Sequence, residues 1–137
     1  MKPLRWGILG TGMIARKFAQ SLPESQTGTL AVTGSRTVEG AERFAQEFGG
    51  AGAFYQGVLD APNVDAVYIA LPHHLHEEWT IKSAKAGKAI LCEKPFTLDA
   101  PSAERALKAV GEEGVYFAEA FMYRFHPQIA EMKEIIA

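Results

Sequence analysis

The residues "GILGTGMIA", Gly7 to Ala15, are the best guide to the architecture of this 137-residue chain. They contain the spacing Gly10-x-Gly12-x-x-Ala15, placed between an apolar run and a helical pattern. In a strand–turn–helix unit, the first glycine permits a tight turn, the second lets the backbone approach a pyrophosphate, and the small third residue lets the helix pack closely. The amides at the start of the helix then point at the phosphates. Because glycine-rich turns are common, the alternative is a purely structural turn, and the position directly after the first strand favours dinucleotide binding.

The rest of the chain alternates between strand and helix patterns. Apolar or small residues recur with helical spacing over residues 38–48, whereas residues 65–71 are largely apolar at consecutive positions, as in a parallel strand covered on both faces. This alternation predicts an α/β fold, a Rossmann-type doubly wound parallel sheet flanked by helices with strand order 3-2-1-4-5-6. The expected strands are residues 4–9, 29–35, 53–56, 65–71, 89–92 and 115–118, and the expected helices are residues 13–22, 38–48, 76–86, 100–113 and a last one from 127.

Composition and charge narrow the class of protein. Hydrophobic residues make up 47% of the chain and charged residues 22%, a balance typical of a folded domain. The formal net charge of -2 gives no electrostatic footprint for nucleic acid or an anionic membrane. The single cysteine, Cys92, cannot form an internal disulfide, and we interpret it as a small buried apolar residue without a redox role. The sequence shows neither a signal peptide nor a membrane-spanning segment, so we expect a cytoplasmic protein.

The end of the second expected strand indicates which dinucleotide fits. An acidic residue there would accept hydrogen bonds from the ribose 2′-hydroxyl of NAD, but the sequence is "TGSRT", Thr33 to Thr37. Ser35 can hydrogen-bond a 2′-phosphate, and Arg36 can pair with that phosphate and stack on adenine. We therefore expect NADP(H) as the cofactor rather than NAD. The alternative is that Arg36 is a solvated loop arginine.

Three histidines follow the fourth expected strand, within "LPHHLHEE", Leu71 to Glu78. No acidic or cysteine partner has a recognisable zinc-ligand spacing, so we expect no metal site. In this fold the carboxyl ends of the central strands line the cofactor crevice, which places Leu71, Pro72, His73 and His76 beside the glycine turn. For His76, the alternative is a hydrogen-bonded histidine at the start of a helix.

An apolar strand ends in two opposite charges within "AILCEKPFTLDA", Ala89 to Ala100. We expect Glu93, Lys94 and Pro95 to lie in the same crevice. A lysine desolvated at the end of a buried strand can have its charge tuned for proton transfer, with an adjacent carboxylate countering it. Lys94 and Glu93 are therefore the candidate catalytic residues, and the alternative is a strand-end salt bridge.

Four segments together resemble a known family. The glycine turn, "PHHLH", "CEKP" and "EAFMYRFHP" are similar to the glucose-fructose oxidoreductase, inositol dehydrogenase and rhizopine catabolism (Gfo/Idh/MocA) family, and the last is most like its NADP-dependent dihydrodiol and sugar dehydrogenase branch. The resemblance implies that Lys94 contacts the substrate hydroxyl and assists proton transfer as a hydride moves to or from nicotinamide. It implies that Glu93 orients the site, that the bond before Pro95 is a candidate cis peptide, and that Arg124 lies near the nicotinamide and the substrate entrance.

Two positions fit the family pattern less closely. His73 stands where the family usually has an asparagine, which puts its contact with the cofactor in doubt. For Arg124, the alternative to a site role is a surface pairing with Glu119 or Glu131.

The resemblance also implies a domain organisation and a function. Residues 1–125 would form the dinucleotide-binding domain, and residues 126–137 would begin the connection to a C-terminal domain that supplies most substrate contacts and a catalytic histidine. The chain would be the cofactor-binding portion of an NADP-dependent oxidoreductase acting on a sugar, polyol or dihydrodiol, incomplete for catalysis alone. The alternative is a non-catalytic NAD(P)-binding or sensing module. For the full-length protein we expect a small-molecule sugar, polyol or diol substrate and a homo-oligomer, with neither nucleic acid nor membrane as a partner.

The candidate cofactor-binding residues share one property, a place in the glycine turn or at the end of an expected strand. They are Gly10, Thr11, Gly12, Met13, Ile14, Ser35, Arg36, Leu71, Pro72, His73, His76, Glu93, Lys94 and Arg124.

Overall fold

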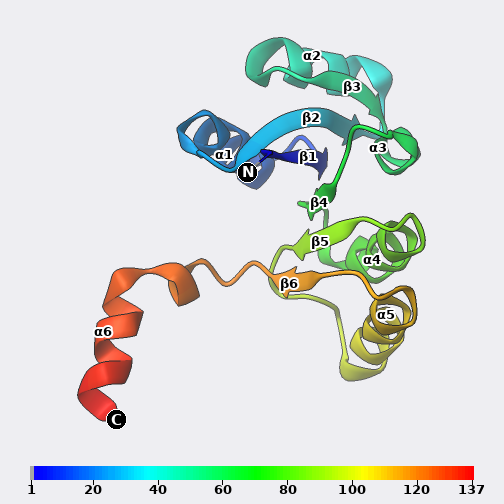
Figure 1. Cartoon of the computed structure of the whole chain (residues 1–137). Coiled ribbons are helices and arrows are strands. Elements are labelled where there is room, and N and C mark those ends of the chain that lie inside the picture. The colour runs from blue at the N-terminus through cyan, green and yellow to red at the C-terminus, as the bar shows by residue number, and fades with distance from the viewer. Residues whose placement is uncertain (1) are drawn as a thin grey trace.

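A six-stranded parallel sheet forms the centre of the structure, a computed structural model that describes residues 2–137 (Figure 1). The strand order is β3-β2-β1-β4-β5-β6, and every neighbouring pair is parallel, which confirms the predicted doubly wound α/β fold. The strands are β1 (Leu4–Leu9), β2 (Gly28–Ser35), β3 (Ala51–Phe54), β4 (Ala66–Ile69), β5 (Ala89–Cys92) and β6 (Phe117–Glu119). The α-helices are α1 (Met13–Ser21), α2 (Val38–Phe48), α3 (Tyr55–Asp60), α4 (His76–Lys85), α5 (Ala100–Glu113) and α6 (Pro127–Ile136), and the short 3₁₀ helices are η1 (Leu22–Glu24), η2 (His73–Leu75) and η3 (Met122–Phe125).

Two separate apolar clusters mark the two faces of the sheet. α1 and α2 pack on one face, in a cluster that contains Ile8, Phe44 and Tyr68. α3, α4 and α5 contribute to the other cluster, which contains Leu9. Ile8 and Leu9 are adjacent and both fully buried, because successive strand residues point to opposite faces. All four residues of β4 are buried, so the prediction of a central strand covered on both faces is confirmed.

Some boundaries differ from the sequence prediction. β3 ends at Phe54, two residues earlier than predicted, because the chain turns into the six-residue helix α3, which is too short to give a periodic signal. β6 begins at Phe117 rather than 115, because the C-terminal cap of α5, which ends at Glu113 as predicted, includes the next residues. Gly114 takes a φ of 64° there, and the N–H of Val115 still donates to the carbonyl of Val110 at 3.3 Å.

The buried cysteine agrees with its sequence interpretation. Cys92 is fully buried at the end of β5, and burial raises the pKa of its thiol to about 12. A thiol that stays protonated is a poor nucleophile, so Cys92 behaves as an apolar core residue.

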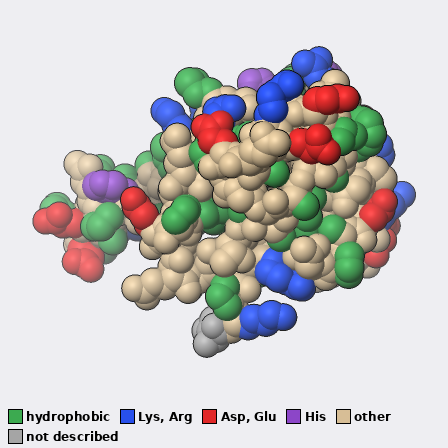
Figure 2. All heavy atoms as spheres, turned by 90° about the horizontal axis from the view of Figure 1, so that it is seen from above, with side chains coloured by type: hydrophobic (Ala, Val, Ile, Leu, Met, Phe, Trp, Pro, Cys, Tyr) green, Lys and Arg blue, Asp and Glu red, His purple; other side chains and the backbone are tan. Residues whose placement is uncertain are grey.

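The surface adds two observations. α6 extends away from the sheet in Figure 1 and has no buried residue, and its proposed role as the start of a connection stays a prediction. Acidic and basic side chains are interspersed on the face shown in Figure 2. Among residues 2–137, no helix has both the length and the apolar character that crossing a bilayer requires.

Candidate cofactor and catalytic site

The segments predicted to form the crevice meet at one edge of the sheet. The strand register aligns one residue from each of five strands, namely Gly34, Leu9, Ile69, Cys92 and Glu119. Hydrogen bonds continue one residue past this row, because the Gly10 N–H donates to the Gly34 carbonyl at 2.9 Å and the Glu93 N–H donates to the Ile69 carbonyl at 3.0 Å. The predicted cofactor crevice therefore lies at the carboxyl ends of β1 and β4, where the strand order changes direction. Ligands usually bind at this position in doubly wound sheets.

The three small residues of the glycine turn are each required to be small for a different structural reason. Gly10 has a φ of 114°, and a Cβ there would lie 2.5 Å from the Ala70 carbonyl oxygen, so only glycine fits. Ala15 is fully buried, as close packing of α1 requires. A Cβ on Gly12 would meet nothing within 4 Å, so the space in front of this residue is open. The approach of a pyrophosphate to Gly12 remains a prediction that this geometry permits.

The start of α1 suits an anion. Gly12 is its N-cap residue and offers no side-chain hydrogen bond, and the first turn holds no acidic residue. By contrast, the Thr37 side chain caps α2. The first amides of α1, at Met13 and Ile14, are therefore not occupied by a capping side chain, and the Thr11 amide lies in the turn just before them. The positive end of the helix dipole adds to their attraction for phosphate.

The end of β2 brings together groups suited to a second phosphate. Ser35 is the last residue of β2 and is buried, whereas Arg36 is exposed directly after it. Thr37 accepts a hydrogen bond from the Gly40 N–H at 3.1 Å, which places the N-terminus of α2 beside them. Burial raises the pKa of Tyr55, and the nearby charge of Arg36 opposes this. The Ser35 hydroxyl, the Arg36 guanidinium and the N-terminus of α2 thus lie close together at the end of β2. This is the position where an acidic side chain would have favoured NAD over NADP.

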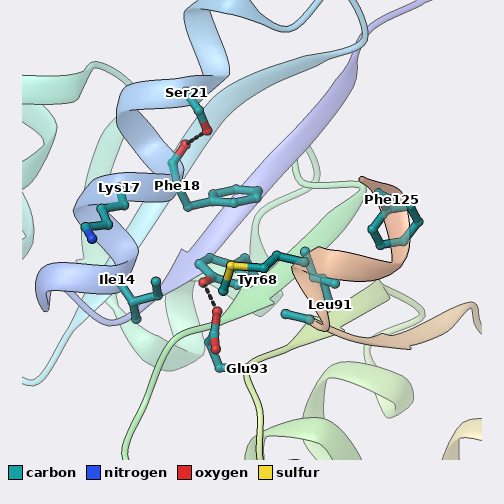
Figure 3. A pocket seen from close by; sticks show the side chains of 10 residues that line it. Ile14, Lys17, Phe18, Ser21, Tyr68, Leu91, Glu93 and Phe125 are labelled. Carbon is teal, nitrogen blue, oxygen red and sulfur yellow. Dashed lines mark hydrogen bonds between the residues drawn. The ribbon is translucent and has the colours of Figure 1, made fainter. Parts of the chain in front are cut away.

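Glu93 is held by a tyrosine that sequence reasoning missed. The Tyr68 hydroxyl donates to Glu93 Oε1 at 2.6 Å (Figure 3). The Lys94 N–H donates to Glu93 Oε2 at 3.2 Å. Burial raises the pKa of Tyr68 above its usual value, and the hydrogen bond to Glu93 raises it further. The register offers a signal, since Tyr68 pairs with Leu91, two residues before Glu93, which puts Tyr68 and Glu93 on the same face.

Lys94 differs from its sequence expectation in one respect. Its side chain is exposed in this chain, so the predicted desolvation is wrong here, because the residue follows the end of β5 where no element covers it. Within residues 2–137, no salt bridge joins Lys94 to Glu93, since Tyr68 holds that carboxylate. The carboxylate therefore does not counter the ammonium directly. The predicted cis bond between Lys94 and Pro95 is confirmed.

His76 does not have the exposed position expected of a residue that contacts a cofactor. Its ring is fully buried, with Nε2 2.8 Å from the Leu71 carbonyl oxygen and Nδ1 3.0 Å from that of Phe96 and 3.1 Å from that of Pro95. The prediction of direct cofactor contact is wrong, because both ring nitrogens are occupied by backbone. The hydrogen-bonded histidine at the start of a helix is what the structure contains.

The neighbouring candidates divide between buried and exposed positions. Leu71 is buried, whereas Pro72 and His73 are exposed at the start of η2. No group of three metal-ligating side chains occurs within residues 2–137.

Arg124 lies in η3 and is exposed. In the described part of the chain it has no salt bridge, so the surface pairings with Glu119 or Glu131 are not found. Glu119 has another role, which sequence reasoning missed, because its Oε1 accepts a hydrogen bond from the Phe96 N–H at 2.9 Å. A role for Arg124 near the nicotinamide stays a prediction.

A cavity of about 430 Å³ lies between α1 and the face of the sheet that carries Tyr68 (Figure 3). It is mostly apolar, and the Glu93 carboxylate is the acidic group at its wall. Its lining residues are Ile14, Lys17, Phe18, Ser21, Tyr68, Leu91, Glu93, Ala120, Met122 and Phe125. The cavity extends from the start of α1 to the end of β5, two of the places that the sequence assigned to the cofactor.

Comparison with known proteins agrees with this geometry. The sequence profile of the Gfo/Idh/MocA family, described as an oxidoreductase family with an NAD-binding Rossmann fold, matches residues 4–121. A dTDP-3,4-didehydro-2,6-dideoxy-alpha-D-glucose 3-reductase of Actinomadura kijaniata is 38% identical over 98% of this chain and 41% of its own length. The trans-1,2-dihydrobenzene-1,2-diol dehydrogenase of Mus musculus is 36% identical over 97% of this chain and 41% of its own length. The D-xylose 1-dehydrogenase (NADP(+)) of Hypocrea jecorina is 34% identical over 98% of this chain and 38% of its own length.

Solved structures show the same relationship. The crystal structure of a 3-ketoreductase from Actinomadura kijaniata in complex with NADP and TDP-benzene superposes with a TM-score of 0.91 and 36% identity, covering 98% of this chain and 42% of that protein. The chain spans about two fifths of the length of the curated relatives it matches. The chain belongs to the Gfo/Idh/MocA oxidoreductase family.

Proposed function

We propose that this family member is the NADP(H)-binding domain of an oxidoreductase that transfers a hydride between nicotinamide and a hydroxyl or carbonyl carbon of a sugar, polyol or dihydrodiol. The observation that carries the proposal is the meeting of the glycine turn, Ser35–Arg36 and Glu93–Lys94 at one edge of the sheet. Relatives that are named as NADP-dependent, or solved with NADP, support the choice of cofactor.

Different residues would bind the pyrophosphate and the 2′-phosphate of the cofactor. The turn at Gly10–Gly12 and the first amides of α1 would hold the pyrophosphate, since no side chain caps that helix. Ser35 and Arg36 would hold the 2′-phosphate through a hydroxyl and a charge-assisted hydrogen bond. When bound, nicotinamide supplies the acceptor or donor of the hydride.

Lys94 would move the proton that accompanies the hydride. In the direction of alcohol oxidation, the neutral amine at Nζ takes the hydroxyl proton while the hydride leaves the carbon, and in the direction of reduction the ammonium returns a proton to the carbonyl oxygen. Glu93, held by Tyr68, would orient the crevice beside the cofactor rather than neutralise Lys94 directly.

A hydride-transfer assay tests this function. The domain, expressed with the sequence that follows Ala137 in its gene, is mixed with NADP⁺ or NADPH and a panel of sugars, polyols, diols and their carbonyl forms. We expect a change in NADPH absorbance with at least one of them. A protein that binds NADPH but never oxidises or reduces any member of the panel would instead be the non-catalytic binding or sensing module. That the longer protein is a homo-oligomer stays a prediction, which analytical ultracentrifugation would test.

A further inference from the structure

We propose that His76 is a positioning residue that fastens together the two loops on the nicotinamide side of the crevice, an inference that rests on the proposed NADP(H)-binding function. One loop follows β4 and contains Leu71, and the other follows β5 and contains Pro95 and Phe96. His76 itself is the first residue of α4, which lies between the two strands in sequence.

The contacts of the imidazole reach both loops at once. Nε2 lies 2.8 Å from the Leu71 carbonyl oxygen, while Nδ1 lies 3.0 Å from the Phe96 carbonyl oxygen and 3.1 Å from that of Pro95. A carbonyl oxygen can only accept, and a neutral imidazole has a single N–H. The ring therefore hydrogen-bonds both loops at once in its doubly protonated form, which donates from both nitrogens. With the ring fully buried, no water competes for these contacts.

Besides the packing of the buried Phe96 ring against Phe117, the loop after β5 makes few hydrogen bonds to other elements. Pro95 has no N–H to donate, and the Phe96 N–H is taken by Glu119 Oε1 at 2.9 Å. The Glu119 contact ties this loop to β6, whereas the His76 contact ties it to the loop after β4. Lys94 lies between Glu93, which is hydrogen-bonded to Ile69 and Tyr68 of β4, and Pro95, so His76 supplies the attachment on the far side of Lys94.

Loss of the His76 contacts should weaken binding of the nicotinamide half of the cofactor but not of the adenosine half. The ring is fully buried and its hydrogen-bond partners are backbone carbonyls of these loops, and β1 lies between β4 and β2, the strand that ends at Ser35. His76 therefore affects the cofactor through the loops it holds. Adenosine 2′,5′-bisphosphate carries the adenosine and the 2′-phosphate but lacks the nicotinamide half. Its binding should be insensitive to His76, whereas NADPH binding should depend on it. A residue that merely contributed to core stability would not separate the two ligands.

The experiment is calorimetric titration of this chain with NADPH and with adenosine 2′,5′-bisphosphate, at a temperature where circular dichroism shows every variant folded. His76→Phe keeps an aromatic ring but removes both donors. We expect it to weaken NADPH binding about tenfold and to leave bisphosphate binding within about twofold, since a few lost buried hydrogen bonds have effects of this size. His76→Asn and His76→Gln each keep a side-chain amide that can donate hydrogen bonds, and we expect intermediate losses.

Val110→Ala is the control, because Val110 is a buried core residue on α5 that makes none of these contacts. It should lower stability while leaving the affinity of both ligands unchanged. Unchanged NADPH affinity in His76→Phe, or equal weakening of both ligands, overturns the inference while the proposed function stands. If the wild-type chain does not bind NADPH, the proposed function fails and this inference fails with it.

Amide hydrogen exchange tests the same idea without a ligand. In His76→Phe, or in the Asn and Gln variants if the Phe variant does not fold, exchange should accelerate at residues 71–75 and 94–97 more than elsewhere. A uniform acceleration over the whole chain would contradict a specific link between the two loops.

Discussion

The two ends of the crevice are built in different ways. On the side proposed to bind adenosine, Ser35, Arg36 and Thr37 are consecutive residues that run from the end of β2 to the start of α2. On the side proposed to bind nicotinamide, the contacts that shape the loops join residues far apart in sequence, such as Tyr68 with Glu93 and Glu119 with Phe96. We infer that the first side selects the cofactor through one short segment, whereas the second depends on the packing of the whole half-sheet.

The largest expected effect is at Lys94, on the side proposed to bind nicotinamide. In the longer protein, Lys94→Ala should lower kcat by roughly 100- to 10,000-fold, the usual range for loss of an acid–base group, while NADPH affinity changes little. Steady-state kinetics and calorimetry measure the two quantities separately. Lys85→Ala is the control, since Lys85 is exposed at the end of α4. Unchanged turnover in Lys94→Ala would remove this residue from the mechanism.

Arg36→Ala should instead lower the affinity for NADPH, with its largest effect on binding rather than on kcat. Loss of a charge-assisted hydrogen bond to phosphate should weaken NADPH binding roughly 10- to 100-fold, whereas NADH, which could lose only stacking on adenine, should be weakened much less. Arg43→Ala, at an exposed position of α2, serves as the matched arginine control. Parallel calorimetric titrations give the comparison, and equal losses for both nucleotides would argue that Arg36 does not contact the 2′-phosphate.

The glycine turn, which lies between the two ends, allows a sharper test with two variants. Gly12→Ala should weaken NADPH binding about tenfold without destabilising the chain, because its Cβ points into open space. Gly10→Ala should lower the free energy of unfolding by about 2 kcal/mol or more, because of its φ of 114° and the nearby Ala70 carbonyl oxygen. Urea unfolding and calorimetry measure both. A Gly12→Ala variant with full affinity would place the pyrophosphate elsewhere.

The smallest effect lies at the opposite edge of the sheet. Hydrogen bonds from the Arg5 side chain and backbone N–H hold the pKa of Asp65 well below its usual value. A lowered pKa in the folded chain means that the ionised carboxylate stabilises the fold above the unfolded pKa near 4, and that this stability is lost as the pH falls.

Asp65→Asn should therefore lower Tm by about 3 °C at neutral pH, with a difference that shrinks below about pH 4. NADPH affinity should be unaffected, since Asp65 precedes β4 at the end away from the crevice. Thermal melts over a pH series provide the measurement. A Tm difference that grows on acidification would contradict the assigned role of the Arg5–Asp65 pair.

How much the sequence could predict follows from the same contrast. Gly10, Arg36 and Lys94 were located from motifs and chain order, because parallel strands bring their carboxyl ends to one edge. The hydrogen bond of Tyr68 and the partners of His76 could not be predicted, because they depend on strand register and on the path of two loops. The exposure of Lys94 was missed for a related reason, since burial at a strand end depends on what covers it rather than on the strand.

The comparison of NADPH with NADH on the wild-type chain tests the central claim most directly. Calorimetric titration with each nucleotide measures what the 2′-phosphate contributes to binding through Ser35 and Arg36. We predict that NADPH binds at least about tenfold more tightly than NADH, as one strong charge-assisted contact requires. Equal affinities, or tighter binding of NADH, would contradict the account.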